Sequence, residues 1–264
     1  MLFPEQRPNN LVQTIERVAT IFDAMAQSAQ GISLKELSAK VDLPKGTTHR
    51  LLSSLAYFGY VRQASESKNY HLGFKLVELG NRLLDQLDLR AQARPFLVNL
   101  CKRTKETVHL VVLDQNEALY IDKVESDEKP SGLQMVSRVG LRVSTHCSSV
   151  GKVLLAHLSD QQLHALIKED GLEKRTENTI IDPGKLKRHL KVVRQQGYAI
   201  DDEENEKGIR CVGAPVLNQQ GQVIAAISIS GPTVRMTKKI IQKTLQNEVI
   251  RTALDISREL GYQG

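Results

Sequence analysis

The stretch Ile32–Val61, ISLKELSAKVDLPKGTTHRLLSSLAYFGYV, decides the fold of this 264-residue chain, because its pattern predicts two short helices joined by a tight turn and followed by a strand. Ser33 is a favourable helix N-cap, and Glu36 three residues later completes a capping-box pattern. Pro44 disfavours helix in the residue before it and so separates the two helices. The second helix is predicted from Lys45 to Phe58, with leucines on its inner face and short or basic residues on its outer face.

This pair of helices has two interpretations. A short basic helix presented across a tight turn is how a helix-turn-helix protein enters the DNA major groove. An ordinary helical hairpin with solvated charges would show the same pattern. The outward residues are Lys45, Thr47, Thr48, His49 and Arg50.

The residues after the second helix favour DNA binding. Gly59 ends that helix, and short strands at 60–62 and 70–72 form a hairpin of the length expected for a wing. Arg62 and Lys68 at its rim are placed to contact phosphates, which position a protein on DNA without reading sequence. The order of three helices and a hairpin therefore predicts a winged helix-turn-helix domain.

Two further helices frame this domain. The segment from Leu11 to Gln27 carries apolar residues on one face and supplies the first helix. The segment from Phe74 to Leu89 carries leucines at helical spacing directly after the wing. We expect this second segment to pack on the DNA-binding domain and to pair with its copy in a dimer. The predicted boundaries are 1–73 for the DNA-binding domain and 74–90 for the linker and dimerisation helix.

Composition limits the possible function classes. The net charge of +6 permits a polyanionic partner, but residues 1–73 hold only eight Lys and Arg against six Asp and Glu, so the motif carries the DNA-binding hypothesis. Cys101, Cys147 and Cys211 form no CxxC pair, which indicates reduced thiols rather than a zinc ribbon or a disulfide framework. The sequence shows no apolar run of membrane-spanning length and no signal-peptide pattern. We expect a cytoplasmic protein without metal or cofactor.

Strands and helices alternate beyond residue 90, which predicts an α+β fold with an antiparallel sheet flanked by helices over 91–264. Domains of this build often hold small ligands between sheet and helices. The residues from Arg90 to Pro95 are expected to open this region without helix. The predicted strands are Val108–Leu113, Ala118–Val124, Leu133–Val136, Leu141–Val143, Tyr198–Asp201, Gly208–Leu217 and Val223–Ser230. The predicted helices are Phe96–Thr104, Ser148–Leu158, Asp160–Lys168, Pro183–Gln196 and Thr237–Leu260.

The chain resembles the IclR family of bacterial transcription regulators over essentially its whole length. The resemblance is carried by LPKGTTHRLLSSLAYFGYV and YHLGFKLVELG in the first half, and by STHCSSVGKVLLAHL and GYAIDDEENEKGIRCVGAPVLNQQGQVIAAISISGP in the second. It implies a winged helix-turn-helix, a linker helix and a GAF-like effector-binding domain. It also implies dimers or tetramers on palindromic operators, with most members repressing and responding to small organic acids. TKETVHLVVLD, YIDKVES, MVSRVGLR and the ending ISRELGY are most similar to the branch that senses sugar acids such as 2-keto-3-deoxygluconate.

The recognition helix departs from the family pattern. The family usually shows a serine or threonine, a threonine and then an apolar residue after the lysine, whereas Gly46 and Thr48 occupy the first and third of these positions here. Gly46 removes a possible hydroxyl contact to phosphate. Thr48 is expected to exchange packing for a base or phosphate contact. The predicted DNA-binding residues are Ser33, Lys45, Thr47, Thr48, His49, Arg50, Arg62 and Lys68.

An effector pocket is predicted around the helix that begins near Ser148. Backbone N–H groups at a helix start bind anions, although simple capping gives the same pattern, and SSVGK is not a phosphate-binding P-loop. Ser228 and Ser230 alternate with isoleucines, so both hydroxyls face one side of a strand. The resemblance adds the other positions. The predicted effector-binding residues are Met135, His146, Ser149, Val150, Asp201, Cys211, Ser228 and Ser230.

Other interpretations stay open at the level of sequence. Asp201 begins an acidic run that is typical of a solvated loop, and a metal site of His146, Cys211 and Asp201 has spacing too loose to argue. A lone buried cysteine is usually a small apolar residue, but Cys211 as a nucleophile would suit an enzyme with a DNA-binding appendage. An architectural DNA protein with a vestigial pocket is a further alternative. We expect a repressor without catalytic residues that responds to a sugar acid, or else to aromatic acids or glyoxylate and pyruvate.

Overall fold

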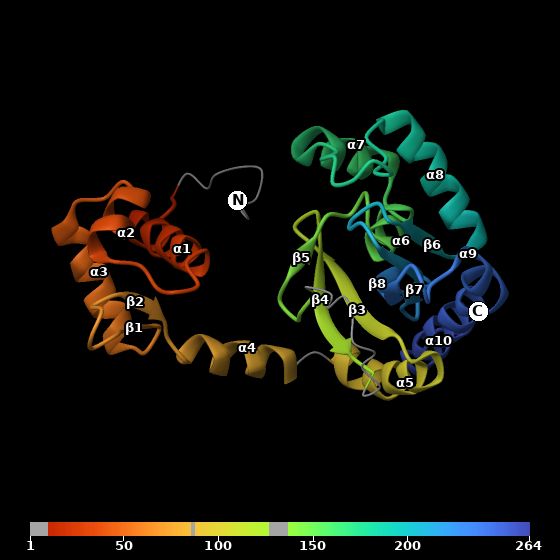
Figure 1. Ribbon diagram of the computed structural model, residues 1–264, viewed down its shortest axis with the longest axis horizontal. Coiled ribbons are helices and arrows are strands. Elements are labelled where there is room, and N and C mark those ends of the chain that lie inside the picture. The colour runs from red at the N-terminus through yellow and green to blue at the C-terminus, as the bar shows by residue number, and fades with distance from the viewer. Residues whose placement is uncertain (1–9, 86–87, 127–136) are drawn as a thin grey trace. The chain divides into compact units, whose positions relative to one another are not determined.

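The computed structural model describes residues 10–85, 88–126 and 137–264, and these form two compact units, Met1–Gln86 and Leu87–Gly264, called unit 1 and unit 2 below (Figure 1). The division falls inside the segment predicted as the linker, and the domain boundaries at 73 and 90 stay a prediction. Among the residues described, no helix is both long and apolar enough to cross a bilayer.

Unit 1 contains the predicted helix-turn-helix and hairpin. The capping box at its second helix is confirmed: the Ser33 hydroxyl accepts the Glu36 N–H, and the Glu36 carboxylate accepts the Ser33 N–H. Ile21, Leu37 and Leu52, one from each helix, are fully buried together and hold the three helices around one core. The elements are α1 (Gln13–Ala26), α2 (Leu34–Lys40), α3 (Lys45–Tyr57), β1 (Val61–Gln63) and β2 (Tyr70–Leu72), with the two strands antiparallel.

The linker region differs from the single helix predicted at Phe74–Leu89. Helix α4 covers Lys75–Asp85, and a separate helix α5 covers Asp88–Thr104, including the residues from Arg90 to Pro95 that were expected to lie outside a helix. Pro95 lies on the exposed side of α5, although proline removes one backbone hydrogen bond from a helix interior. Ala93 and Leu97 on either side of it are fully buried, so packing overrides the local signal.

Within its described residues, unit 2 is built on a sheet of six strands in the order β5-β4-β3-β8-β7-β6, and the pairing is antiparallel throughout, as predicted. The sheet therefore places β3 and β8, which are far apart in sequence, side by side at its centre. The predicted strand at Leu133–Val136 lies outside the described residues. The strands are β3 (Thr107–Asp114), β4 (Glu117–Val124), β5 (Arg142–Val143), β6 (Ala199–Asp202), β7 (Ile209–Leu217) and β8 (Val223–Pro232).

Helices cover both faces of this sheet. Figure 1 shows α5 and α10 on one side and α6, α7 and α8 on the other, and each side has its own apolar core. The closing helix predicted at Thr237–Leu260 is interrupted: a π-helical segment separates two α-helical pieces. The helices are α6 (Ser149–Leu155), α7 (Asp160–Asp170), α8 (Pro183–Gln196), α9 (Lys238–Ile240), the π-helical η1 (Ile241–Leu245) and α10 (Gln246–Glu259).

Candidate functional site

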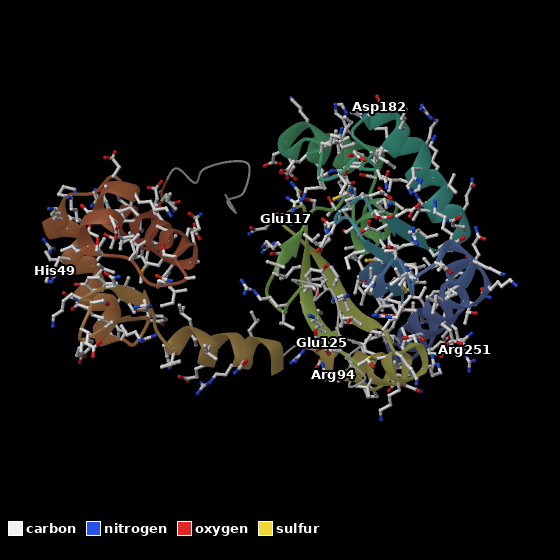
Figure 2. All side chains as sticks on the ribbon, viewed as in Figure 1. His49, Arg94, Glu117, Glu125, Asp182 and Arg251 are labelled. Carbon is white, nitrogen blue, oxygen red and sulfur yellow. The ribbon has the colours of Figure 1, made fainter. Side chains whose placement is uncertain are left out.

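The outer face of α3 presents the basic residues expected of a recognition helix. Lys45, His49 and Arg50 are exposed and Thr47 is half-buried, and Figure 2 labels His49 on the solvent side of α3. Gly46 is exposed, and a Cβ added there would have no atom within 4 Å. This surface is therefore open to a groove of DNA.

The position of Thr48 contradicts the prediction that its side chain contacts DNA. Its side chain is fully buried, and its hydroxyl donates to the Pro44 carbonyl oxygen at 3.2 Å. Thr48 thus occupies a packing position inside unit 1 rather than a surface position. The Ser33 hydroxyl is also engaged, because it serves the capping box of α2 and donates to the Glu36 carboxylate at 2.7 Å.

The rim of the wing carries two exposed cations. Arg62 lies on β1 with its guanidinium carbon 5.8 Å from the Phe74 ring centroid, a cation–π distance. Lys68 lies in the turn with a positive φ of 56°, and its backbone carbonyl accepts from the Gln63 amide at 2.9 Å. Both charged groups project into solvent from an ordered hairpin.

Unit 2 contains a cavity of about 570 Å³ on the α6 side of its sheet. The strand register explains why polar side chains of the sheet form the floor of the cavity. Asp201 pairs with Cys211, and Cys211 pairs with Ser230, while Ser228 pairs with His109, so β6, β7, β8 and β3 each place polar side chains on this face. The cavity is lined by His109, Glu117, Tyr120, Ser137, Leu141, Arg142, Val143, Ser144, Ser148, Ser149, Val150, Glu173, Arg175, Asp201, Asn205, Glu206, Ile209, Cys211, Ser228 and Ser230.

The start of α6 forms one wall of the cavity. The Ser148 hydroxyl caps the helix by accepting the Gly151 N–H at 3.2 Å and donates to the Ser144 carbonyl at 2.8 Å. A Cβ on Gly151 would lie 2.3 Å from the Thr145 backbone, so only glycine lets the helix approach this loop. Ser149 and Val150 are thereby fixed at the cavity wall.

Six of the predicted effector-binding residues line the cavity: Ser149, Val150, Asp201, Cys211, Ser228 and Ser230. His146 is not among the lining residues; its Nε2 lies 3.0 Å from the Glu173 carbonyl oxygen, and burial lowers the pKa of the imidazole. Met135 lies outside the described residues. The cavity thus gathers residues from His109 to Ser230, which lie 121 positions apart in sequence, and the roles of the predicted residues stay a prediction.

Sequence reasoning missed His109. Its imidazole is buried with Nδ1 3.3 Å from the Ser228 hydroxyl, Nε2 2.9 Å from the Ser137 hydroxyl, and the ring centroid 4.9 Å from that of Tyr120. Burial lowers its pKa to about 3, so the ring is neutral and offers one donor and one acceptor. Its alternation with the apolar residues of β3 was visible in the sequence, but its pairing with Ser228 depends on a long-range register.

Arg142 and Arg175, which are not among the predicted site residues, also line the cavity. Arg142 forms ion pairs with Asp114 and Glu117, and Arg175 forms one with Glu173 at 3.2 Å. Guanidinium groups bind carboxylates in a bidentate manner, so both arginines are suited to an acidic ligand.

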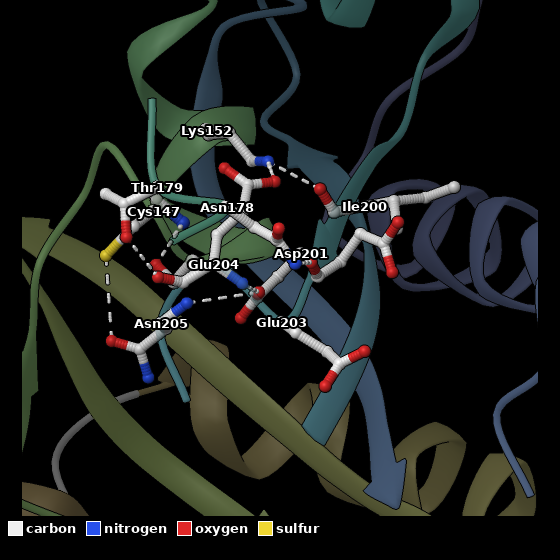
Figure 3. Close-up of polar contacts among 12 residues, drawn as sticks. Cys147, Lys152, Asn178, Thr179, Ile200, Asp201, Glu203, Glu204 and Asn205 are labelled. Carbon is white, nitrogen blue, oxygen red and sulfur yellow. Dashed lines mark hydrogen bonds and ion pairs between the residues drawn. The ribbon is translucent and has the colours of Figure 1, made fainter. Parts of the chain in front are cut away.

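A cluster of charged side chains surrounds Asp201, which lies at the β6 end of the polar floor (Figure 3). The Asp201 carboxylate accepts the backbone N–H groups of Glu204 and Asn205 at 2.8 and 3.3 Å. Burial raises the pKa of Asp201 to about 7, although the nearby Lys152 ammonium opposes the shift. The acidic run is therefore not the solvated loop that its sequence suggests, since Asp201 and Glu204 are both buried.

The cavity's thiol is poorly suited to catalysis. Burial raises the pKa of Cys211 well above its ordinary value, with the Asp201 carboxylate adding to the shift, and a thiol held protonated is a weak nucleophile. Within the described ranges, no group of three or more His, Cys, Asp or Glu side chains is arranged to hold a metal ion.

Comparisons with known proteins agree with this architecture. Residues 14–65 match the IclR helix-turn-helix domain, and residues 81–258 match the family described as bacterial transcriptional regulator IclR C-terminal. The chain is 37% identical to the HTH-type transcriptional regulator XynR of Escherichia coli K12, covering 96% of this chain and 98% of that protein. It is 36% identical to the HTH-type transcriptional regulator KdgR of the same organism, covering 98% and 96%.

A solved structure shares the whole fold. The crystal structure of the Thermotoga maritima IclR superposes with a TM-score of 0.75 at 36% sequence identity, covering 94% of this chain and 99% of that one. The family consists of transcriptional regulators rather than enzymes, which removes the catalytic alternative for Cys211. The match to both halves of the family shows that the chain belongs to the IclR family of bacterial DNA-binding transcriptional regulators.

Proposed function

We propose that the chain is a cytoplasmic repressor that binds a palindromic operator as a dimer or tetramer and responds to a sugar acid such as 2-keto-3-deoxygluconate. One observation carries the proposal: the effector-binding half of this DNA-binding regulator contains a cavity of about 570 Å³ whose floor is a continuous row of hydroxyl, imidazole and carboxyl groups.

The lining favours a polyhydroxylated acid over an aromatic one. Among the described residues, its apolar side chains are Leu141, Val143, Val150 and Ile209, beside Cys211 and the Tyr120 ring. The buried hydroxyls of the lining can form hydrogen bonds with the hydroxyl groups of a sugar acid, whereas a benzene ring offers them none. In our proposal the backbone N–H groups at the start of α6, together with Arg142 or Arg175, bind the carboxylate, and Asp201 accepts hydrogen bonds from the sugar hydroxyls.

DNA binding is assigned to α3 and the wing. We assign base-edge and phosphate contacts to Lys45, Thr47, His49 and Arg50, and phosphate contacts to Arg62 and Lys68. Ser33 acts indirectly, by fixing the start of α2. A two-fold symmetric dimer would place two such helices in successive major grooves, ~34 Å apart.

Unit 1 carries apolar surface suited to a second copy of the chain. On α4, Leu79 and Leu83 lie four residues apart and are 41% and 60% exposed, and Ile15 on α1 is 63% exposed. Exposed apolar side chains at helical spacing are typical of a helical dimer interface. Effector binding then alters operator affinity to the extent that the effector prefers one arrangement of the dimer.

Operator binding measured across a panel of acids tests the proposal. The panel contains 2-keto-3-deoxygluconate, pyruvate, glyoxylate and 4-hydroxybenzoate, with a DNA fragment selected by the protein itself. We expect 2-keto-3-deoxygluconate to release the protein from this DNA, and Arg50→Gln to weaken binding by tenfold or more without unfolding the chain. Insensitivity to every acid would instead support an architectural DNA protein, and a response to 4-hydroxybenzoate alone would contradict the sugar-acid assignment.

A further inference from the structure

Lys152 is a fully buried lysine that the proposed function does not use. It lies on α6, one turn after the cavity wall at Ser149, yet it does not line the cavity. Its ammonium group contacts the Glu204 carboxylate and the Ile200 carbonyl oxygen (Figure 3). Burying an ammonium group costs folding free energy unless the group is paired. An apolar residue would fill a purely structural position at a lower cost in folding free energy.

The contacts of Lys152 lead directly to Asp201. Glu204 is held by Lys152, and the Glu204 backbone N–H in turn donates to the Asp201 carboxylate at 2.8 Å. The backbone around Glu204 is fixed a second time by Thr179, whose hydroxyl donates to the Glu204 carbonyl at 2.6 Å. The turn that carries Asp201 is therefore clamped from α6 and from the 176–179 loop.

The charges in this cluster do not balance. With both carboxyl groups ionised, Asp201 and Glu204 share the single positive charge of Lys152. The second oxygen of Glu204, Oε2, is buried and has no hydrogen-bond partner among the described residues. Other ionisable groups that act on Asp201 or share its surroundings are Glu206, Cys147, Cys211, Tyr120, His109, Glu173 and Arg175. The ammonium group of Lys152 is the buried cation of this set, so the charge state of Asp201 depends on it.

We propose that Lys152 is a positioning residue of the effector site: through Glu204 it holds the turn that presents Asp201 to the cavity, and its charge favours the ionised Asp201 that accepts hydrogen bonds from effector hydroxyls. The inference rests on the proposed function of this cavity. An ionised carboxylate is an acceptor at both oxygens, whereas a protonated one must place a donor toward the ligand.

Two substitutions with opposite electrostatic effects test this role. Lys152→Met removes the positive charge and leaves Asp201 protonated to higher pH, because burial and the Glu204 charge are then opposed mainly by the backbone N–H groups of Glu204 and Asn205. Affinity for 2-keto-3-deoxygluconate at pH 7 should fall roughly tenfold or more, since hydrogen bonds to charged groups are strong, and should recover at higher pH. Glu204→Gln removes a negative charge near Asp201, so the rise of effector affinity with pH should occur at lower pH than in the wild-type chain. Lys152→Arg, which keeps the charge, should retain the wild-type profile.

Calorimetry from pH 5.5 to 8.5 gives the readout, with circular dichroism and operator binding to confirm that each variant is folded. In buffers of different ionisation enthalpy, binding near pH 7 should release a fraction of a proton from Asp201 in the wild-type chain. Pyruvate, an acid without hydroxyl groups, should show neither the release nor the shifts. If Lys152→Met does not fold, the direction of the Glu204→Gln shift decides the question.

The outcomes separate this inference from the proposed function. An unshifted profile in Lys152→Met, or in Glu204→Gln, with a responsive wild-type chain would overturn the role of Lys152 alone. A wild-type chain that binds none of the acids would overturn the proposed function, and this inference with it.

Discussion

The Thr48 hydroxyl donates to the Pro44 carbonyl oxygen at 3.2 Å, one helical turn earlier. The bond lies inside unit 1, because Thr48 is fully buried. A residue that looks available to DNA in the sequence KGTTHR thus secures the first turn of α3, and the exposed residues of the recognition surface are its neighbours His49 and Arg50.

Thr48→Val should therefore leave operator affinity within about twofold of wild type. Valine preserves the buried volume and loses one hydrogen bond, which costs about 1 kcal/mol of folding free energy. Arg50→Gln is the matched change on the exposed side of the same helix and should weaken operator binding by tenfold or more. Fluorescence anisotropy with labelled operator and urea unfolding provide the two measurements. A folded Thr48→Val protein that no longer binds operator would show that the hydroxyl does reach DNA.

Two glycines of the same domain should respond oppositely to alanine. Gly46 lies in the first turn of α3 with open space around its missing Cβ, so Gly46→Ala should stabilise the chain by about 0.5–1 kcal/mol. Gly59 has a φ of +78°, where a side chain is strained, so Gly59→Ala should destabilise it by about 1 kcal/mol or more. Urea unfolding followed by circular dichroism tests both. Equal effects of the two changes would contradict this assignment of backbone conformations.

The sequence predicts what depends on local pattern. The capping box at Ser33, the Pro183 start of α8 and most strands of the sheet follow from residue spacing, and the structure confirms them. It does not predict what depends on distant pairing. His109 joins the cavity only because β3 pairs with β8, and Lys152 meets Glu204 only because α6 packs near the end of β6. Neither residue carries a local signal that separates it from an ordinary strand histidine or a surface lysine.

Buried histidines should make the chain sensitive to acid. Burial lowers the pKa of His109 to about 3, below its ordinary value near 6.5. As the pH falls below 6.5, this histidine is therefore protonated in the unfolded chain but not in the folded chain, and the folded chain loses stability. This group alone removes up to about 1.4 kcal/mol of stability per pH unit. His189, whose pKa burial lowers to about 4, acts in the same direction.

In His109→Gln, the unfolding free energy should fall less steeply as the pH is lowered, by up to the slope that one proton contributes. The contribution of His189 should remain. Unfolding free energies measured at pH 7, 6, 5 and 4.5 for the wild type, His109→Gln and His189→Gln give the slopes. A His109→Gln slope equal to the wild-type slope would mean that His109 is already charged in the folded chain. The same variant should weaken acid-effector binding, since the imidazole links the Ser228 and Ser137 hydroxyls on the cavity floor.

Asp201→Asn should stabilise the protein while weakening its response to effector. The folded-state pKa of Asp201 is raised to about 7 from an ordinary value near 3.8, so the folded chain binds this proton more tightly than the unfolded chain does. The resulting loss of stability is absent below about pH 4, grows between pH 4 and 7, and is complete above pH 7. Asparagine keeps a carbonyl oxygen to accept the Glu204 and Asn205 N–H groups but removes the buried charge.

The gain in unfolding free energy for Asp201→Asn should reach about 2–4 kcal/mol at pH 8 and shrink toward zero as the pH is lowered to 4. Asp182→Asn is the surface control, because Asp182 is exposed and caps α8, and its effect should be a small loss that lacks this pH dependence. Binding sites often retain residues that cost stability, so a more stable Asp201→Asn protein with a blunted effector response is what a site residue predicts. If Asp201→Asn is less stable than wild type at pH 8, the carboxylate contributes to the fold through its hydrogen bonds, and the charged cluster exists for structure rather than for ligand binding.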